Sequence, residues 1–236
     1  MYHSVENLNP HKDRMGLAVP PDVFRMHMEY LKENGFHVIG LPDFVQRIRQ
    51  ELPIPERSVA ITFDDGYRSI LTKVFPVLQR QGFAATLFVN IHFVERKLSR
   101  DAYWCDWQTL SWDEVRKLSG DGMVIGSHGV THRRLSELSY DEISLEILQS
   151  KEIIENNINK PVSEFSYPQG SFNKEAMEIL QNNDFVCACS SLCGINGNES
   201  DMFALKRTEI TAFDDTPAKF GKKISGRYDW LSIVGK

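Results

Sequence analysis

The sequence lacks the features of several common protein classes. No stretch of its 236 residues approaches the roughly 18 apolar residues of a membrane span. The opening MYHSVENLNPHK has neither the basic nor the apolar region of a signal peptide, so the chain as given predicts a cytoplasmic protein. A cell-envelope or secreted location is the alternative if the natural start lies upstream. Repeats and low-complexity linkers are also missing.

Acidic residues outnumber basic ones in the sequence. The chain has 27 Lys and Arg against 32 Asp and Glu, which gives a net charge of −5, and its basic residues are scattered along the sequence. Proteins that bind nucleic acids usually carry a concentrated basic surface. The composition therefore argues against a nucleic-acid partner and favours a small, neutral or uncharged one.

Cysteine is scarce, with four residues in the chain. In a chain of this length without an export sequence, we expect thiols rather than disulfides at Cys105, Cys187, Cys189 and Cys193. The spacing in CACSSLC resembles a metal cluster, but its first two cysteines lie in FVCACSS, an apolar run typical of a strand. We interpret them as small buried side chains without a chemical role.

Short β-rich runs alternate with segments of helical periodicity. Repeated strand and helix units predict parallel strands, and seven or eight such units form a barrel; a doubly wound open sheet is the alternative. The runs expected to be strands are 1–5, 36–41, 58–63, 84–90, 123–128, 164–168, 185–191 and 204–211. Three segments repeat apolar residues at helical spacings: Phe24, Met28 and Leu31; Phe44, Ile48 and Leu52; and Ile143, Ile147, Ile154 and Ile158.

Polar residues stand at the ends of several expected strands. His3, the pair Asp64 and Asp65, His128, and the YPQ segment at 167–169 all fall there. In parallel α/β folds the active site forms at the carboxyl ends of the strands. These residues are therefore the candidates for a common site.

His128 and His132 are four residues apart, a spacing that lets two imidazoles bind one ion. A lone pair of this kind is more often two surface histidines. With a carboxylate from another strand end, the pair becomes a set of two histidines and one carboxylate. Such a set leaves coordination positions open for water and substrate, as a catalytic zinc requires.

The pair Asp64 and Asp65 has two interpretations. A following glycine and a helical segment favour a turn or a helix N-cap, for which one carboxylate would suffice. Adjacent side chains point in different directions, so one carboxylate is able to bind a cation while its neighbour takes a proton from water. The second interpretation explains why there are two.

The segments TFDDG (62–66) and SHGVTH (127–132) resemble two motifs of the polysaccharide deacetylase family, also called the NodB homology domain or carbohydrate esterase family 4. The resemblance covers nearly all of residues 1–236 and implies a single domain with a distorted (β/α)7 barrel. It implies that Asp64 is the general base and that Asp65, His128 and His132 hold a divalent metal, usually zinc. The implied reaction removes an N-acetyl group from an amino sugar, so the expected partner is an N-acetylated carbohydrate.

Two departures from the common family pattern point to one branch. FSYPQG has Ser166 in place of the arginine of the third motif and Gln169 in place of its tyrosine, and no histidine follows His132. Both departures resemble the poly-N-acetylglucosamine deacetylases of biofilms, which carry a Tyr-His near the N-terminus. That resemblance implies that His3 is the general acid. The alternative is a flexible terminal residue.

Further residues are weaker candidates for the site. Arg207 would either supply positive charge to Asp64 or form a surface or structural ion pair. The backbone N–H of Gln169 is the expected oxyanion donor, and Tyr167 would help to shape the pocket. Segment 93–112 is a candidate substrate loop whose tryptophans would stack on sugar rings or pack in the core: Trp104, Trp107 and Trp112.

Two rival functions remain open from the sequence. One is deacetylation of a small or carrier-linked amino sugar, which a chain without an export sequence would suit. The other is a carbohydrate-binding barrel that has lost catalysis, for which the missing C-terminal histidine is the support. The location of the protein inside or outside the cell separates the first rival from a polymer deacetylase, and acetate release separates the second; the sugar and its linkage are set by the pocket-lining loops.

Overall fold

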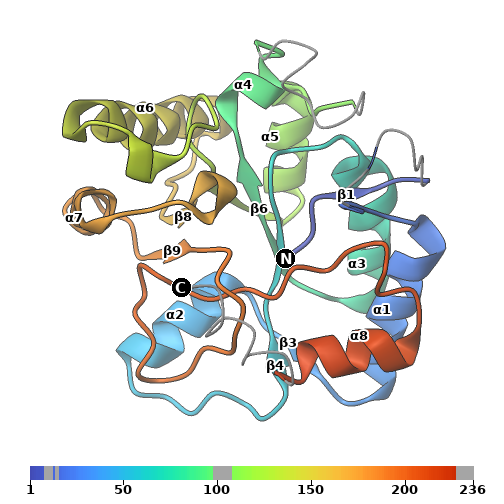
Figure 1. The fold of residues 1–236 in the computed structure, drawn as a ribbon. Coiled ribbons are helices and arrows are strands. Elements are labelled where there is room, and N and C mark those ends of the chain that lie inside the picture. The colour runs from blue at the N-terminus through green and yellow to red at the C-terminus, as the bar shows by residue number, and fades with distance from the viewer. Residues whose placement is uncertain (8–12, 14–15, 98–107, 227–236) are drawn as a thin grey trace.

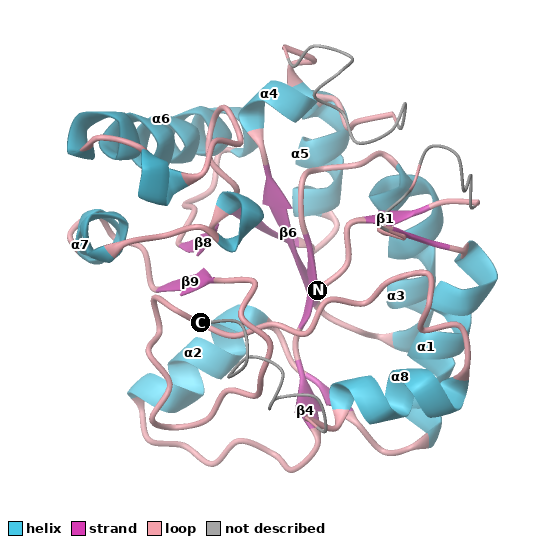
Figure 2. Cartoon of the chain, in the orientation of Figure 1, coloured by secondary structure: helices cyan, strands magenta, loops and turns pink. Residues whose placement is uncertain are grey.

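The computed structural model of the protein describes residues 1–7, 13, 16–97 and 108–226. Its strands lie in the middle of the molecule and its helices around the outside (Figures 1 and 2). The central sheet has five parallel strands in the order β5-β6-β7-β8-β9. Their bounds are β5 (Ile61–Phe63), β6 (Ala85–Val89), β7 (Val124–Ser127), β8 (Glu164–Ser166) and β9 (Cys187–Cys189).

An extended segment around Leu205 continues this sheet beyond β9. The Leu205 N–H donates to the Ala188 carbonyl at 2.9 Å, and the Ser190 N–H donates to the Leu205 carbonyl at 2.8 Å. The pairing is parallel, as in the rest of the sheet. The strand expected at 204–211 is thus present as an extended segment with one isolated bridge.

The N-terminal residues connect this segment to β5 and complete the ring. The Tyr2 N–H donates to the Thr62 carbonyl at 2.9 Å, and the Asp64 N–H donates to the Tyr2 carbonyl at 3.0 Å. On the other side, the Ile210 N–H donates to the Met1 carbonyl at 2.9 Å. Seven segments therefore form a ring, so the predicted (β/α)7 barrel is confirmed and the open sheet is not adopted.

Helices cover the outside of the barrel. The longer ones are α1 (Pro21–Glu33), α2 (Leu41–Arg49), α3 (Phe75–Gln81), α5 (Trp112–Gly120), α6 (Tyr140–Ile158), α7 (Lys174–Gln181) and α8 (Pro217–Ile224). A short α4 (Ile91–Val94) follows β6, and a π-helical turn at Ile70–Val74 precedes α3. Two strand pairs flank the barrel: β1 (Ser4–Val5) with β2 (Ala18–Val19), and β3 (His37–Val38) with β4 (Ser58–Val59).

The helix faces follow the periodicity with one exception. The predicted apolar faces of α1 and α6 are buried, and Ser139 with Glu142 forms a capping box at the start of α6. Helix α2, however, ends at Arg49, so Leu52 lies beyond it and is 42% exposed. Glu51 adopts a positive φ of 53° and Pro53 follows, and this combination ends the helix before the expected residue.

The N-terminal segment is fixed to the barrel by its tyrosine. Tyr2 is buried, and its hydroxyl donates to His27 Nδ1 at 3.2 Å. The His27 Nε2–H in turn donates to the Asp214 carbonyl at 2.7 Å, and its ring stacks on Phe220 with centroids 4.0 Å apart. His3 therefore follows a residue that is anchored in the core and not a flexible end.

The cysteines of β9 are structural. Cys187 and Cys189 are buried in that strand, Cys193 is half-buried, and all three carry free thiols. Cys105 lies outside the described residues. Across the described ranges, no helix has the length and apolar character needed to cross a membrane.

Candidate metal centre and active site

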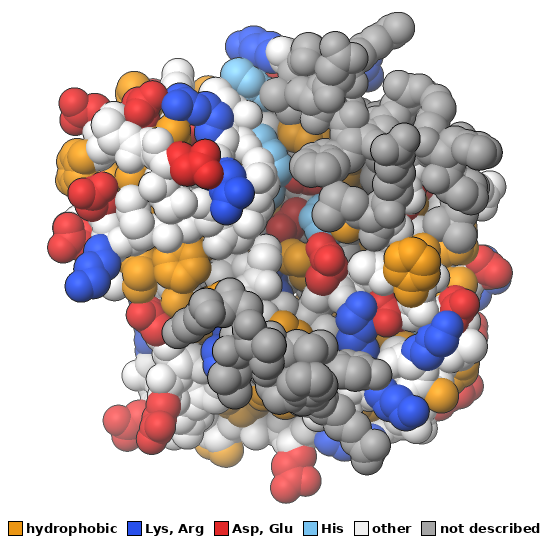
Figure 3. All heavy atoms as spheres, viewed as in Figure 1, with side chains coloured by type: hydrophobic (Ala, Val, Ile, Leu, Met, Phe, Trp, Pro, Cys, Tyr) orange, Lys and Arg blue, Asp and Glu red, His pale blue; other side chains and the backbone are white. Residues whose placement is uncertain are grey.

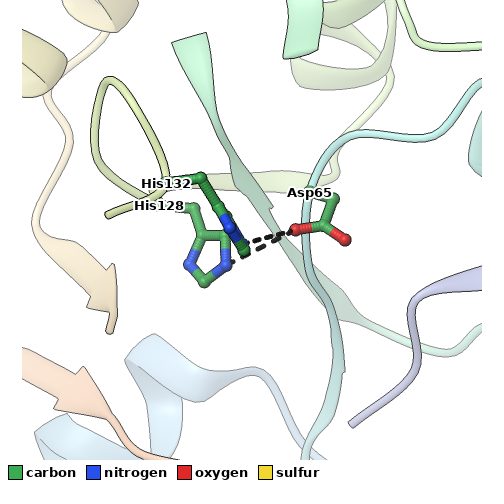
Figure 4. A group of neighbouring side chains, drawn as sticks. All are labelled: Asp65, His128 and His132. Carbon is green, nitrogen blue, oxygen red and sulfur yellow. Dashed lines mark ion pairs between the residues drawn. The ribbon is translucent and has the colours of Figure 1, made fainter. Parts of the chain in front are cut away.

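Three side chains from two strand ends meet at one point. Asp65 follows β5, and His128 and His132 follow β7. The Nε2 atom of His128 lies 3.5 Å from Asp65 Oδ1, and the Nε2 atom of His132 lies 3.3 Å from the same oxygen. Figure 4 shows both imidazoles directed at this carboxylate. Asp65 and His132 adopt positive φ angles of 76° and 64°, which few residues other than glycine tolerate, so the backbone is bent to bring them together.

The three groups fit a divalent metal such as zinc. Asp65 Oδ1 is buried and accepts no hydrogen bond from any described residue, so its lone pairs are free to bind a cation. The Nδ1–H of His128 donates to the Ser166 carbonyl at 2.8 Å, which leaves the Nε2 lone pair for a ligand. The three ligand atoms lie within 4.8 Å of one another. This donor set is the one that zinc sites with open positions use.

Burial and charge set the protonation of these groups. Burial lowers the pKa of His128 to about 4, so its imidazole is neutral near pH 7, as a metal ligand must be. Burial alone would raise the pKa of Asp65, but the neighbouring His132 outweighs it and holds that pKa below its usual value. Burial lowers the pKa of His132, yet contact with Asp65 raises it above its usual value overall.

Asp64 is held by a buried arginine. The Arg207 guanidinium donates to Asp64 Oδ1 at 2.7 Å and to Oδ2 at 2.8 Å, and the Ser166 hydroxyl donates to Oδ2 at 3.1 Å. Burial would raise the pKa of Asp64, but the charge of Arg207 holds it far below its usual range. The sequence left open whether Arg207 supplies positive charge to Asp64 or forms another ion pair. In the structure Arg207 contacts Asp64, and this contact is buried.

His3 lies beside the two aspartates at the same end of the barrel. Its side chain is 15% exposed, and the carbonyl of the preceding Tyr2 accepts the Asp64 N–H at 3.0 Å. Its Nδ1 lies 3.9 Å from Glu209 Oε1 and is buried without a hydrogen-bond partner among the described residues. The fold thus brings the first line of the sequence to the strand ends where the aspartates stand.

Gln169 and Tyr167 differ in position. Gln169 is exposed near the loop that carries His128 and His132, and its side-chain Nε2 donates to the His132 carbonyl at 3.4 Å. Tyr167 is fully buried, donates its hydroxyl to the Phe203 carbonyl at 2.8 Å and stacks on Phe172 at 4.7 Å. Adjacent strand residues face opposite sides, so Ser166 reaches Asp64 while Tyr167 packs elsewhere. The structure thus places Tyr167 in the core next to Ser166, and its expected part in shaping the pocket stays a prediction.

Asn90 is a site residue that the sequence analysis missed. It follows β6 and is fully buried, and its Nδ2 donates to the His128 carbonyl at 2.8 Å and to the Gly129 carbonyl at 3.2 Å. Its Oδ1 accepts the Phe93 N–H at 3.3 Å, which caps α4. A polar residue directly after the apolar run LFV (87–89) was the available indication.

The candidate substrate loop is described only in part. Trp112 is the first residue of α5 and packs partly buried against the core, which favours the packing interpretation for this residue. Trp104 and Trp107 lie outside the described residues. On the face shown in Figure 3, histidine and acidic side chains lie along a hollow near the middle of the molecule.

Comparison with known proteins identifies the family. The model of the polysaccharide deacetylase family matches residues 52–188, which is more than half of the chain. The chain belongs to this family. A solved structure, the Streptococcus pyogenes deacetylase PplD in complex with acetate, superposes with a TM-score of 0.83 over 95% of this chain and 96% of that one, at 20% identity. The structure of IcaB from Ammonifex degensii gives 0.77 over 92% and 93%, at 18% identity. At these identities the two structures support the shared fold.

Relatives by sequence lie in the same family. YxkH of Bacillus subtilis is 26% identical over 211 residues, which are 89% of this chain and 70% of that protein. The poly-beta-1,6-N-acetyl-D-glucosamine N-deacetylase of Escherichia coli K12 is 36% identical over 133 residues, which are 54% of this chain and 20% of that protein. The chain thus matches only a fifth of the E. coli relative. Family membership supports an N-deacetylase activity, and deacetylases of this family generally depend on a metal.

Proposed function

We propose that this chain is a metal-dependent N-deacetylase that removes acetyl groups from the amino sugars of a glycan, with zinc as the preferred metal. The observation that carries the proposal is the buried group of Asp65, His128 and His132 next to a second carboxylate, Asp64, which has its own cationic partner. Poly-N-acetylglucosamine, chitin-like and peptidoglycan-like polymers are the candidate substrates. The name of the E. coli relative supports the first of them.

The metal would be held by Asp65, His128 and His132, and when bound it would polarise the acetamide carbonyl and activate water. Asp64 is the proposed general base: the pairing with Arg207 keeps its carboxylate ionised, and the Ser166 hydroxyl fixes its orientation. The backbone N–H of Gln169 is the proposed donor to the oxyanion of the tetrahedral intermediate. Gln169 adopts a positive φ of 55°, a conformation that differs from the adjoining strand.

His3 is the proposed general acid, which protonates the amine as the C–N bond breaks. We expect His3→Ala to lower kcat for N-deacetylation by about 10²- to 10⁴-fold, the usual contribution of a positioned acid. Hydrolysis of 4-nitrophenyl acetate should fall far less, because a nitrophenolate leaves without protonation. Zinc affinity should not change. His37→Ala is the matched control, since His37 is exposed on β3, outside the site. Equal losses on amide and ester would contradict the acid role.

The experiment that tests the function is acetate release from a panel of acetylated sugars. The panel contains β-1,6-linked and β-1,4-linked N-acetylglucosamine oligomers, peptidoglycan and the free monosaccharide, each with and without zinc. We expect zinc-dependent acetate from at least one polymeric substrate. Release from the monosaccharide alone would favour the rival small-sugar enzyme. Binding of zinc and oligomer with no acetate from any substrate would favour a non-catalytic barrel.

A further inference from the structure

Glu146 is a buried carboxylate that the mechanism above does not use. It lies on α6, is 5% exposed, and shares the buried face of that helix with Ile143 and Ser150. A charged side chain is rarely buried unless it has partners. The partners of this one lie in the loop that carries the two histidines.

The Glu146 carboxylate binds the backbone between His128 and His132. Its Oε2 accepts the N–H groups of Val130 at 2.7 Å and Thr131 at 2.9 Å. Its Oε1 accepts the Thr131 hydroxyl. Successive backbone N–H groups in a turn form a natural anion-binding concavity. The anion in this concavity is a side chain of the same protein.

Two residues of this loop have left-handed backbone conformations, which glycine adopts freely but which are unfavourable for His132. Gly129 has a φ of 71° and His132 has a φ of 64°. A Cβ atom on Gly129 would lie 3.1 Å from Glu146 Oε2, so the glycine allows the close approach of the carboxylate. Hydrogen bonds to a charged acceptor are stronger than neutral ones, and three of them hold the turn that directs His132 towards Asp65.

We propose that Glu146 is a positioning residue of the metal centre, which sets the affinity for a divalent metal by fixing the turn that carries His132. This inference rests on the metal site of the proposed function. Glu146 contacts the backbone of residues 130 and 131 and the Thr131 hydroxyl rather than the ligand atoms, and its charge also acts on His132. A purely structural carboxylate that attaches α6 to the barrel would stabilise the fold without affecting the metal.

The test compares Glu146→Gln with Glu155→Gln. Glu155 lies on the same helix, accepts the backbone N–H of Val162 at 2.8 Å and pairs with Lys151 at 3.2 Å, so it is a carboxylate with a backbone contact away from the loop that carries the histidines. Zinc dissociation constants are measured by competition with a chromophoric chelator. We expect zinc binding about 10- to 100-fold weaker in Glu146→Gln, the range for residues that orient metal ligands, and nearly unchanged in Glu155→Gln.

Two further readouts separate positioning from folding. The absorption spectrum of the cobalt-substituted protein should change in Glu146→Gln and stay unchanged in Glu155→Gln, because only the first alters the ligand geometry. Saturating zinc should restore most of kcat to Glu146→Gln. If that variant does not fold, Thr131→Val removes only the hydroxyl donor and is expected to weaken zinc binding several-fold.

The inference is overturned if folded Glu146→Gln binds zinc as the wild type does with an unchanged cobalt spectrum. It is also overturned if Glu155→Gln weakens zinc binding as much as Glu146→Gln does. If Glu146→Gln is unfolded, zinc binding by Thr131→Val at the wild-type affinity overturns it. Its failure is distinct from failure of the proposed function. If the proposed function fails at its metal site, His132→Ala binds zinc as tightly as the wild type, and the proposed ligands are wrong.

Discussion

Asp64→Asn should lower kcat for acetate release by about 10²- to 10⁴-fold, which is the usual contribution of a general base. The amide keeps the shape of the side chain but has no basic oxygen to take a proton from water. Zinc affinity should stay close to that of the wild type, because Asp64 is not one of the three converging ligands. The measurement is a pair of assays on one sample: acetate release and zinc competition.

The same substitution leaves Arg207 buried without its anion. Arg207 is 7% exposed and donates two hydrogen bonds to Asp64. Removing one partner of a buried ion pair costs about 3–5 kcal/mol of stability, so the variant must be shown to be folded before it is assayed. The double variant Asp64→Asn with Arg207→Gln is the control: it should regain stability in urea denaturation and remain inactive. Full activity in folded Asp64→Asn would contradict the mechanism.

His128→Ala should abolish both zinc binding and catalysis. It removes a proposed ligand and also the hydrogen bond from Nδ1–H to the Ser166 carbonyl, which fixes the orientation of the imidazole. Loss of a residue that merely orients a ligand costs about 10- to 100-fold in affinity, so loss of the ligand itself should exceed about 100-fold. The chelator competition assay measures the affinity, and acetate release measures the activity.

His128→Ala and Asp64→Asn should both be inactive, but they should differ in zinc content. Asp64→Asn removes the proposed base and keeps the zinc, whereas His128→Ala loses the zinc. A His128→Ala protein that binds zinc normally would contradict the assignment of the ligands. A His128→Ala protein that is active without zinc would contradict the metal dependence of the reaction.

The parts of the site that the sequence predicts are those encoded in short segments. Asp64 and Asp65 are adjacent, and His128 and His132 lie within one turn, so strand ends and spacing were enough to name them. His3 was also a candidate from its place at a strand end, and the family resemblance added the role of general acid. Placement of all three segments at one end of a barrel then followed from parallel strands.

The parts that the sequence did not predict depend on contacts between distant residues. Ser166 reaches Asp64 across 102 positions, and Glu146 reaches Val130 from another element. An indication did exist for Glu146, since it interrupts the apolar face of α6 three residues after Ile143. The burial of Tyr167 beside Ser166 agrees with the alternation of strand side chains, which lets only one of two neighbours face the site.

Metal dependence of the deacetylation is tested by acetate release from an N-acetylglucosamine oligomer by metal-free protein before and after zinc is added. We expect no release before addition, a rate that rises with zinc and levels off at one equivalent, and no recovery in His128→Ala. Acetate release by the metal-free protein at the rate of the zinc-loaded one would contradict it. So would a zinc-loaded protein that releases no acetate from any glycan of the panel.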